Sequence, residues 1–362
     1  MQYTEIKPDM TIADLIRSGA YGALADYIFT DMTPDRCFAK LSEFGFDTVG
    51  FVQGLHRMEE LAASDGQGGA TLVRDIYRDE ERLANWDLAR VKLLYFPAKS
   101  SGKNRDDAGP KPYALVIPGG GFNRQWGFIE GESIAAALNE KGIPAFVLYY
   151  RVKQEPLMPK PLEDMYRAIR YIDENAGQFD VLPGRYMLAG FSAGAVIASE
   201  AGSLNFGWNS APADIPNGAG GAQRWPGADV AKPELIALGY TVVSNKASFA
   251  AYKAAPEGSA AKAGAAAFLR RVGGPLVSEA SLAPYELLDF IDATYPKTYL
   301  VANEDDPVVP IANTKALDKK LTQLGVPHIT RIGRTGGHSF GLGTGLEVGG
   351  WLDACVDFWL RS

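Results

Sequence analysis

The chain has 362 residues, of which 46% are apolar and 22% are charged, and its formal net charge is −7 at pH 7. This length suits two ordinary domains or one large α/β domain, and it can bury a full core without disulfides or metal ions. The negative charge gives no general attraction to nucleic acid or to acidic lipid. Two cysteines, Cys37 and Cys355, are too few for a disulfide framework or a zinc ribbon.

The first ten residues, MQYTEIKPDM, lack a basic start and an apolar run, so they predict no signal peptide. No stretch reaches about 18 consecutive apolar residues, the length that a membrane-spanning helix needs. We therefore expect a cytoplasmic protein that has neither a membrane nor a nucleic acid among its partners.

The N-terminal part of the chain differs from the rest. Its helix-like segments are 12–29, 35–44 and 55–63, and it has no clear buried strand. We interpret residues 1–70 as an N-terminal helical extension, which is available as a cap over the main domain or as an oligomer contact.

Residues 71–362 alternate short apolar runs with helical patterns, which is typical of an α/β domain. Two early runs with alternating polarity, 72–77 and 91–96, predict an antiparallel pair of strands. Apolar residues at helical spacing predict an amphipathic helix over 162–175. Near-continuous apolar runs predict strands that are buried on both faces: 113–117, 145–149, 186–189, 234–238, 298–302 and 328–332. The predicted fold is a mostly parallel eight-stranded sheet with helices on both faces.

Two later stretches interrupt this alternation. Residues 203–231 are rich in Gly, Pro, Ala and Trp and predict an irregular insertion. The Ala- and Gly-rich stretch 247–267 predicts a low-complexity helix. No internal repeat and no Pro/Ser-rich spacer divides the chain, so we predict one large domain over 71–362.

A serine stands at a predicted turn between a strand and a helix. The motif Gly190-Phe-Ser-Ala-Gly194 follows the strand 186–189 and precedes the apolar helical run 195–199. In this context the pattern G-x-S-x-G presents a serine hydroxyl on a sharp turn. The flanking glycines are needed because side chains there would collide with the neighbouring strand and helix. Ser192 is therefore the candidate nucleophile, and the alternative is an ordinary serine in a glycine-rich turn.

A nucleophilic serine needs a base, and the base needs an acid that orients it. In folds that carry this turn, the acid and then the histidine follow the serine along the chain. His56 precedes Ser192 and is excluded for that reason. His328 lies inside the predicted last strand, where we expect a structural imidazole. His338 lies in the glycine-rich loop after that strand and is the predicted base.

Three acidic residues follow the predicted strand 298–302, in Asn303-Glu-Asp-Asp306. Asp306 is our first choice for the acid that orients His338 through its δ nitrogen, and Asp305 is the second choice. The alternative is a solvated acidic turn without a catalytic role.

Three consecutive glycines, Gly119 to Gly121, follow the predicted strand 113–117. Consecutive glycines let main-chain amides point at a ligand without obstruction by side chains. Attack on an ester carbonyl places negative charge on its oxygen, and each preorganised N–H donor there supplies roughly 3–4 kcal/mol. We expect the amides of Gly120, Gly121 and Ala193 to form an oxyanion hole. The glycine patterns of nucleotide-binding loops are not completed here, which disfavours a phosphate site.

Four motifs, taken in order, resemble the α/β-hydrolase superfamily. Within it they resemble the bacterial acetyl-esterase and acetyl-xylan-esterase-like branch, which is related to hormone-sensitive lipase. The resemblance covers roughly residues 71–362, and its motifs are Ile117-Pro-Gly-Gly-Gly-Phe122, Gly190-Phe-Ser-Ala-Gly194, Asp306-Pro-Val-Val-Pro310 and Gly337-His-Ser-Phe-Gly-Leu-Gly343. The chain has P-G-G-G where the esterases usually have H-G-G-G, G-F-S-A-G-A where G-F-S-A-G-G is commoner, and Ser339 where the loop usually has glycine.

The resemblance implies a serine carboxylesterase that hydrolyses small- to medium-acyl esters, with acetylated sugars or phenolic esters as candidate substrates. It implies an acyl-enzyme on Ser192, with His338 as the base and Asp306 as the orienting acid. No metal or organic cofactor is implied, and the expected partner is a small-molecule ester. The alternatives are an acyltransferase or a peptidase that uses the same three residues, or a catalytically silent hydrolase fold used for binding.

Aromatic residues near the motifs and in the insertion are candidates for the substrate pocket. They are Phe122, Phe191, Trp208 and Trp225.

Overall fold

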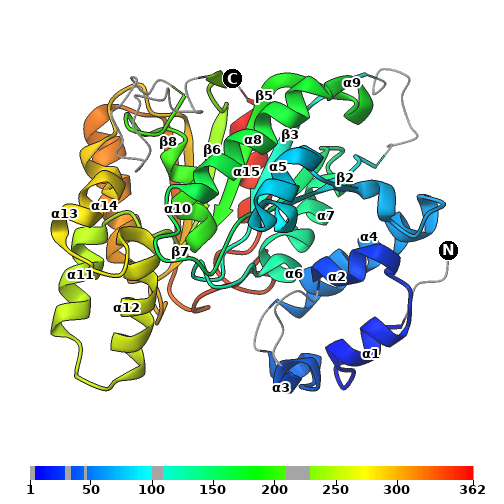
Figure 1. Cartoon of the computed structure of the whole chain (residues 1–362), viewed down its shortest axis with the longest axis horizontal. Helices are drawn as coiled ribbons and strands as arrows, with labels where there is room; N and C mark the ends of the chain where they lie inside the picture. The colour runs from blue at the N-terminus through cyan, green and yellow to red at the C-terminus, as the bar shows by residue number, and fades with distance from the viewer. Residues whose placement is uncertain (1–4, 29–33, 45–46, 100–108, 209–228, 362) are drawn as a thin grey trace.

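Eight strands form a single sheet that lies between two layers of helices (Figure 1). The computed structural model describes residues 5–28, 34–44, 47–99, 109–208 and 229–361. The strand order is β1-β2-β4-β3-β5-β6-β7-β8. The strands are β1 Val73–Arg74, β2 Lys92–Phe96, β3 Lys111–Ile117, β4 Ala145–Tyr149, β5 Val181–Phe191, β6 Leu235–Gly239, β7 Thr298–Asn303 and β8 His328–Gly333.

The eight strands confirm the eight predicted runs, and the sheet is mostly parallel. β1 and β2 form the predicted antiparallel pair, and β2 also lies antiparallel to β4. From β4 to β8, neighbouring strands are parallel. The largest difference is in β5, which begins at Val181 rather than at Tyr186, and its pairing with β3 shifts register between Lys111 and Tyr113.

The N-terminal part contains the helices α1 Ile12–Arg17, α2 Ala25–Ile28, α3 Pro34–Cys37 and α4 Thr48–Ser64. The longer helices of the main domain are α7 Glu132–Glu140, α8 Lys160–Glu174, α10 Ala193–Glu200, α14 Ala312–Leu324 and α15 Trp351–Leu360. Shorter ones are α5 Asp79–Ala84, α6 Gly127–Glu130, α9 Ala176–Phe179 and α13 Glu279–Leu282, with 3-10 turns η1 Gly22–Leu24, η2 Leu41–Glu43, η3 Ala70–Leu72, η4 Trp86–Arg90, η7 Ala283–Tyr285 and η8 Leu287–Asp289.

One helix prediction is wrong in its extent. The stretch 247–267 belongs to two helices, α11 Asn245–Ala254 and α12 Ala260–Gly273. The break falls where Pro256 cannot donate a helical hydrogen bond and Gly258 adopts a φ of +76°. Ser259 then caps α12 by accepting a hydrogen bond from the amide of Lys262.

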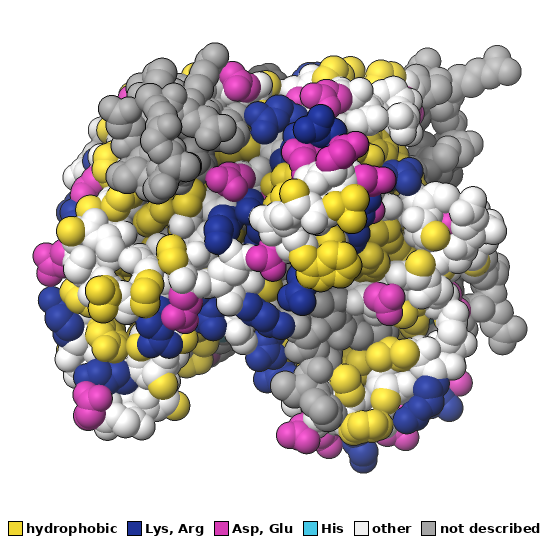
Figure 2. All heavy atoms as spheres, viewed as in Figure 1, with side chains coloured by type: hydrophobic (Ala, Val, Ile, Leu, Met, Phe, Trp, Pro, Cys, Tyr) yellow, Lys and Arg dark blue, Asp and Glu magenta, His cyan; other side chains and the backbone are white. Residues whose placement is uncertain are grey.

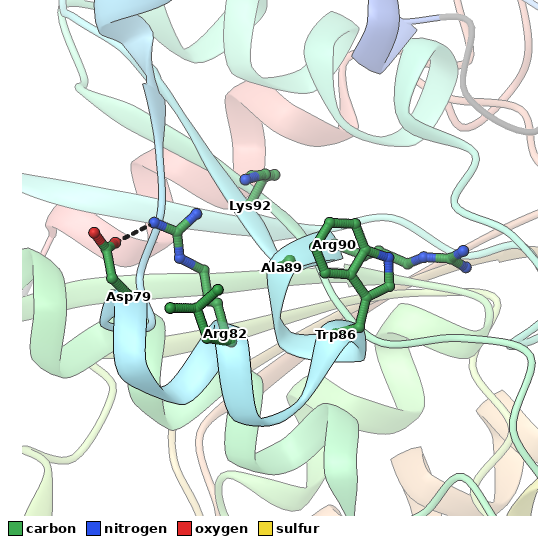
Figure 3. A pocket seen from close by; sticks show the side chains of 7 residues that line it. Asp79, Arg82, Trp86, Ala89, Arg90 and Lys92 are labelled. Atoms are coloured by element: carbon green, nitrogen blue, oxygen red, sulfur yellow. Dashed lines mark hydrogen bonds and ion pairs between the residues drawn. The ribbon is translucent and has the colours of Figure 1, made fainter.

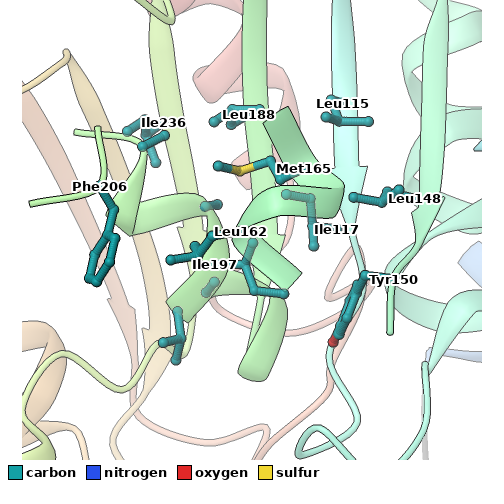
Figure 4. Close-up of a cluster of buried hydrophobic side chains, with 14 of the residues drawn as sticks. Leu115, Ile117, Leu148, Tyr150, Leu162, Met165, Leu188, Ile197, Phe206 and Ile236 are labelled. Carbon is teal, nitrogen blue, oxygen red and sulfur yellow. The ribbon is translucent and has the colours of Figure 1, made fainter. Parts of the chain in front are cut away.

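Alternation along the strands separates two apolar clusters, one on each face of the sheet. In β3, Tyr113, Leu115 and Ile117 belong to the first cluster, while Ala114 and Val116 belong to the second. The first cluster is filled by α8 and α10, whose buried side chains meet those of the central strands (Figure 4). Leu162, Met165 and Ile197 are among these helical residues, and none has measurable exposure.

The second face is covered by α7, α15 and the N-terminal helix α4. Phe51 and Leu55 of α4 are buried in the same cluster as Ile134 and Leu138 of α7. The ring of Phe51 also meets that of Phe128 edge to face, with 5.7 Å between the centroids. The N-terminal helices therefore share the core of the sheet.

Most of the predicted insertion, residues 209–228 with Trp225 among them, lies outside the described residues. Within the described part, no helix combines the length and the apolar character needed to cross a lipid bilayer.

Because the strands from β4 to β8 run parallel, their carboxyl ends meet at one edge of the sheet. In Figure 1, α9 lies at the edge where β5 begins, and α6 lies at the opposite edge, after the end of β3. The motifs with glycine, serine, aspartate and histidine all follow strand ends at that second edge.

A buried ion pair fixes the segment that follows β4. Arg151 Nε lies 3.0 Å from each carboxylate oxygen of Asp164, whose side chain is fully buried. A second guanidinium nitrogen contacts Glu163 at 2.8 Å, and the Tyr77 hydroxyl donates to Asp164 at 2.6 Å. The carboxylate of Asp164 therefore depends on Arg151 for its only charged partner among the described residues.

We predict that Arg151→Met lowers the free energy of unfolding by ~3–5 kcal/mol, because it leaves the buried Asp164 carboxylate without its cation. Urea denaturation of the wild-type protein and the variant measures this. The double variant Arg151→Met/Asp164→Leu should recover most of the loss, since it removes the unpaired charge as well. A loss below ~1 kcal/mol for the single variant would show that this pair contributes no more than a surface ion pair.

Candidate active site

Ser192 stands between the end of β5 and the start of α10, in a backbone conformation that few non-glycine residues adopt. Its φ is +52° and its ψ is −119°. Such conformations cost about 1–3 kcal/mol and persist only where the surrounding structure imposes them. A Cβ atom on Gly194 would collide with the carbonyl oxygen of Ile117, and one on Gly190 would lie 2.5 Å from the carbonyl oxygen of Gly194. Both glycines of the motif are therefore required by close packing, as the sequence predicts.

Ser192, His338 and Asp306 are joined by hydrogen bonds. Ser192 Oγ lies 3.0 Å from His338 Nε2, and His338 Nδ1 lies 2.7 Å from Asp306 Oδ2. The other carboxylate oxygen of Asp306 accepts from the amides of Val308 at 2.7 Å and Val309 at 2.8 Å. These contacts fix the carboxylate on one side and the imidazole on the other. The imidazole in turn reaches the serine hydroxyl.

Asp305 bonds to the backbone of the loop that carries His338, whereas Asp306 bonds to the imidazole itself. Its two carboxylate oxygens accept from the amides of Gly337 at 2.8 Å and Gly336 at 3.1 Å. These amides, Gly337 first, hold the pKa of Asp305 below its usual value. The third acidic residue, Glu304, pairs with Lys315 at 3.3 Å. Each carboxylate of the acidic turn thus has a different partner.

The other two histidines lie elsewhere. His328 is the first residue of β8, at the edge of the sheet opposite to Ser192. Its Nδ1 lies 2.7 Å from the carbonyl oxygen of Val326, and its Nε2 lies 3.3 Å from Thr322 Oγ1, so it serves the local structure. His56 lies in α4. In the described part of the chain, no group of three His, Cys, Asp or Glu side chains is arranged to hold a metal ion.

The three glycines after β3 lie against the serine turn. A Cβ atom on Gly119 would come within 2.6 Å of both the Phe191 carbonyl oxygen and Ser192 Cβ. Gly120 and Gly121 follow with φ of +120° and +62°, conformations that glycine adopts readily. Among the described residues, the amides of Gly120, Gly121 and Ala193 have no protein acceptor. Ala193 is also the first residue of α10, where the helix dipole favours negative charge.

Glu130, which the sequence analysis did not single out, is fully buried beside these loops. Its Oε2 accepts from the Gly119 amide at 2.8 Å, and its Oε1 accepts from the Tyr240 hydroxyl at 2.8 Å. Burial raises the pKa of Glu130, while His338 and the hydrogen bonds oppose the rise. The available sequence signal was weak: two acidic residues, Glu130 and Glu132, in an otherwise apolar helical stretch.

Two of the four aromatic candidates for the pocket are core residues, which corrects the expectation that they line it. The Phe122 ring has no exposed surface and stacks on Phe268 with 5.6 Å between centroids. The Phe191 ring is buried against Trp351, with 5.8 Å between centroids. Neither ring presents an open face to a ligand, because each is buried against aromatic rings of other elements. Trp208 is half-buried, with Lys232 Nζ 5.4 Å from its ring centroid.

The surface is hollowed between the lobe of α11 and α12 and the lobe of the N-terminal helices (Figure 2). A separate hollow of about 560 Å³ lies against α5 and η4 and is lined by none of the candidate site residues. Trp86 and Arg90 of η4 lie on one side of it, and Arg82 pairs with Asp79 on the other (Figure 3). The serine site and this hollow are therefore distinct features of the surface.

Comparison with known proteins gives three kinds of match. Residues 102–211, which include the glycine loop and the serine turn, match the BD-FAE family model. Endo-1,4-β-xylanase B from Butyrivibrio fibrisolvens is 26% identical over 240 residues, or 66% of this chain. The chain spans only 34% of the length of that relative.

Solved structures match over more of the chain. The acetyl ester-xyloside bifunctional hydrolase from Caldicellulosiruptor lactoaceticus has a TM-score of 0.60 and 26% identity, covering 79% of this chain and 94% of that one. A truncated carbohydrate esterase from gut microbiota has a TM-score of 0.57 and 17% identity, covering 74% and 89%.

The family match covers two of the four motifs. The chain therefore has the α/β-hydrolase fold, and its similarity to carboxylesterases and carbohydrate esterases supports an ester hydrolase.

Proposed function

We propose that this protein is a serine carboxylesterase that hydrolyses small- to medium-acyl esters through an acyl-enzyme on Ser192. The observation that carries the proposal is the continuous hydrogen-bonded path from Ser192 Oγ through both ring nitrogens of His338 to Asp306. A serine hydroxyl is a weak nucleophile at neutral pH, and an adjacent base oriented by an acid is the usual means of activating it.

In the proposed first step, Ser192 Oγ attacks the ester carbonyl carbon while His338 Nε2 takes the hydroxyl proton. Asp306 accepts a hydrogen bond from Nδ1–H, so the lone pair of Nε2 faces the serine. The carbonyl oxygen becomes an oxyanion, and the amides of Gly120, Gly121 and Ala193, which have no acceptor among the described residues, are its proposed donors.

The tetrahedral intermediate then collapses. The bond to the alcohol oxygen breaks, His338 gives its proton to that oxygen, and the acyl group stays on Ser192. In the second half, water takes the place of the alcohol. His338 removes a proton from the water, the hydroxide attacks the acyl carbon, and the proton returns to Ser192 Oγ as the acid leaves.

The names of the similar proteins favour an acyl ester carried by a carbohydrate. One of them is an acetyl ester-xyloside hydrolase, another a carbohydrate esterase, and a third a xylanase. We therefore place acetylated sugars first among the substrates and phenolic esters second. Release of acetate from acetylated xylo-oligosaccharides should exceed release of ferulate from feruloyl sugars, and the opposite order would reverse this ranking.

Residues 1–70 are proposed to form one wall of this site. Asp47 Oδ2 accepts from the amide of Thr344 at 3.0 Å, in the loop that follows His338. The Arg36 guanidinium lies 5.0 Å from the ring centroid of Trp126, directly before α6. Both contacts tie the N-terminal helices to segments next to the proposed catalytic residues.

We predict that Ser192→Ala and His338→Ala each lower kcat for p-nitrophenyl acetate by on the order of 10⁴-fold or more, because each removes the nucleophile or its base. Ser192→Ala should also abolish labelling by a fluorophosphonate probe. His328→Ala is the matched control, since it removes a histidine without touching the path, and its kcat should stay near that of the wild type. Unchanged turnover in Ser192→Ala would refute the proposal.

A second prediction separates the two adjacent aspartates. Asp306→Asn should lower kcat/KM by ~10⁴-fold, because an amide holds the imidazole in the wrong tautomer. Asp305→Asn should cost only ~5–100-fold, the effect of weakening hydrogen bonds that a charged group makes to the loop amides. Steady-state kinetics on both purified variants provide the comparison. A larger loss for Asp305→Asn would show that Asp305, and not Asp306, is the orienting acid.

A further inference from the structure

We propose that Glu130 is a positioning residue for this reaction, and that its buried carboxylate holds three loops of the site in one arrangement, two by direct hydrogen bonds and the third through the ring of Tyr240. The loops are the glycine loop after β3, the segment after β6 that carries Tyr240, and the loop after β8 that carries His338. The inference rests on the function proposed above, because it assigns Glu130 a role through His338 and the oxyanion donors.

The first contact of Glu130 fixes the glycine loop. The Gly119 amide donates to Glu130 Oε2 at 2.8 Å. A Cβ atom on Gly119 would lie 2.6 Å from Ser192 Cβ and 2.7 Å from Glu130 Oε2, so this residue is held between the serine turn and the carboxylate. Gly120 and Gly121, whose amides are the proposed oxyanion donors, follow directly. A change at Glu130 therefore moves the donors relative to Ser192.

The second contact fixes the ring against which His338 packs. The Tyr240 hydroxyl donates to Glu130 Oε1 at 2.8 Å. The centroid of the Tyr240 ring lies 4.6 Å from that of His338 and 4.9 Å from that of Phe340. Tyr240 thus lies between the carboxylate and the histidine loop. Its orientation determines the surface against which the His338 imidazole packs.

The partners of Glu130 also indicate its charge. The Gly119 amide and the Tyr240 hydroxyl both donate to it, so the carboxylate acts as an acceptor on both oxygens. The groups packed around the His338 imidazole are the carboxylate of Asp306, the Tyr240 phenol, the Ser192 hydroxyl and, behind the phenol, Glu130. Two carboxylates thus stabilise the positive charge that the imidazole gains when it takes the serine proton.

The test compares Glu130→Gln with Glu132→Gln, using p-nitrophenyl acetate. Glutamine keeps the volume of Glu130 but removes the charge and one acceptor. We expect kcat to fall by ~10–100-fold with KM within ~3-fold, since the loss is felt mainly in the transition state. The acid limb of the profile of kcat/KM against pH should move to lower pH, because one anion that favours the protonated imidazole is gone.

Glu132→Gln is the matched control. Glu132 is as deeply buried as Glu130, two residues away, and burial raises its pKa to about 7. Its carboxylate contacts the Tyr149 hydroxyl at 2.6 Å and none of the three loops. Glu132→Gln should therefore keep both the kcat and the acid limb of the wild type, whatever its effect on the melting temperature.

Wild-type kcat and an unmoved acid limb in folded Glu130→Gln would overturn the inference. If Glu130→Gln does not fold, Tyr240→Phe provides the decision, because it removes the hydroxyl that donates to Glu130 and keeps the ring that packs against His338. It should lower kcat by ~3–10-fold, the effect of one lost hydrogen bond to a charged group, and a wild-type kcat would overturn the inference. Ser192→Ala, measured alongside, keeps the two proposals apart. Turnover that survives Ser192→Ala contradicts the function itself, whereas loss of turnover there beside a normal Glu130→Gln contradicts only the role of Glu130.

Discussion

The close approach of two backbone segments, one after β3 and one after β5, is the constraint on which the site depends. The two strands are parallel neighbours, so their ends lie side by side at one edge of the sheet. Gly194 packs on the carbonyl oxygen of Ile117, and Gly119 packs on Ser192, with no room for a side chain at either position. Because neither glycine has a side chain, the two backbone segments can approach each other closely. The packing around Ser192 then holds it in an otherwise unfavourable backbone conformation.

Buried carboxylates complete this arrangement, and hydrogen bonding is what makes their burial tolerable. Asp306 has the imidazole on one oxygen and two amides on the other. Glu130 has an amide on one oxygen and a phenol on the other. Each carboxylate thus ties a loop to a neighbouring loop, and the same contacts that satisfy the charge also set the geometry of the site. Asp305 acts on the same loop from the solvent side through the amides of Gly336 and Gly337.

The parts of the fold and of the candidate site that are encoded locally could be predicted from the sequence. The strands appear as apolar runs, and the turn at Ser192 appears as a five-residue motif whose two glycines allow close packing against α10 and against the end of β3. His338 and Asp306 were selected by chain order and by their position after strands. The placement of the structural His328 at the start of β8 followed from the same reasoning.

The features that depend on distant parts of the chain could not be predicted. The role proposed for Glu130 depends on its hydrogen bond with Tyr240, which is 110 residues away, and no local sequence pattern predicts that contact. Phe122 and Phe191 sit in functional motifs, yet the direction of each ring is decided by core partners such as Phe268 and Trp351. The division of 247–267 into α11 and α12 depends on Pro256 and Gly258, which can be read in the sequence itself. The alanines around them favour a helix, so the composition of the stretch predicted a single helix.

The central claim is that the acyl group passes through Ser192, and mass spectrometry of the protein quenched during turnover of p-nitrophenyl acetate tests it most directly. The account predicts an acetyl group on the peptide that contains Ser192. Steady turnover with no acetylated peptide, or with the acetyl group on another residue, would contradict it.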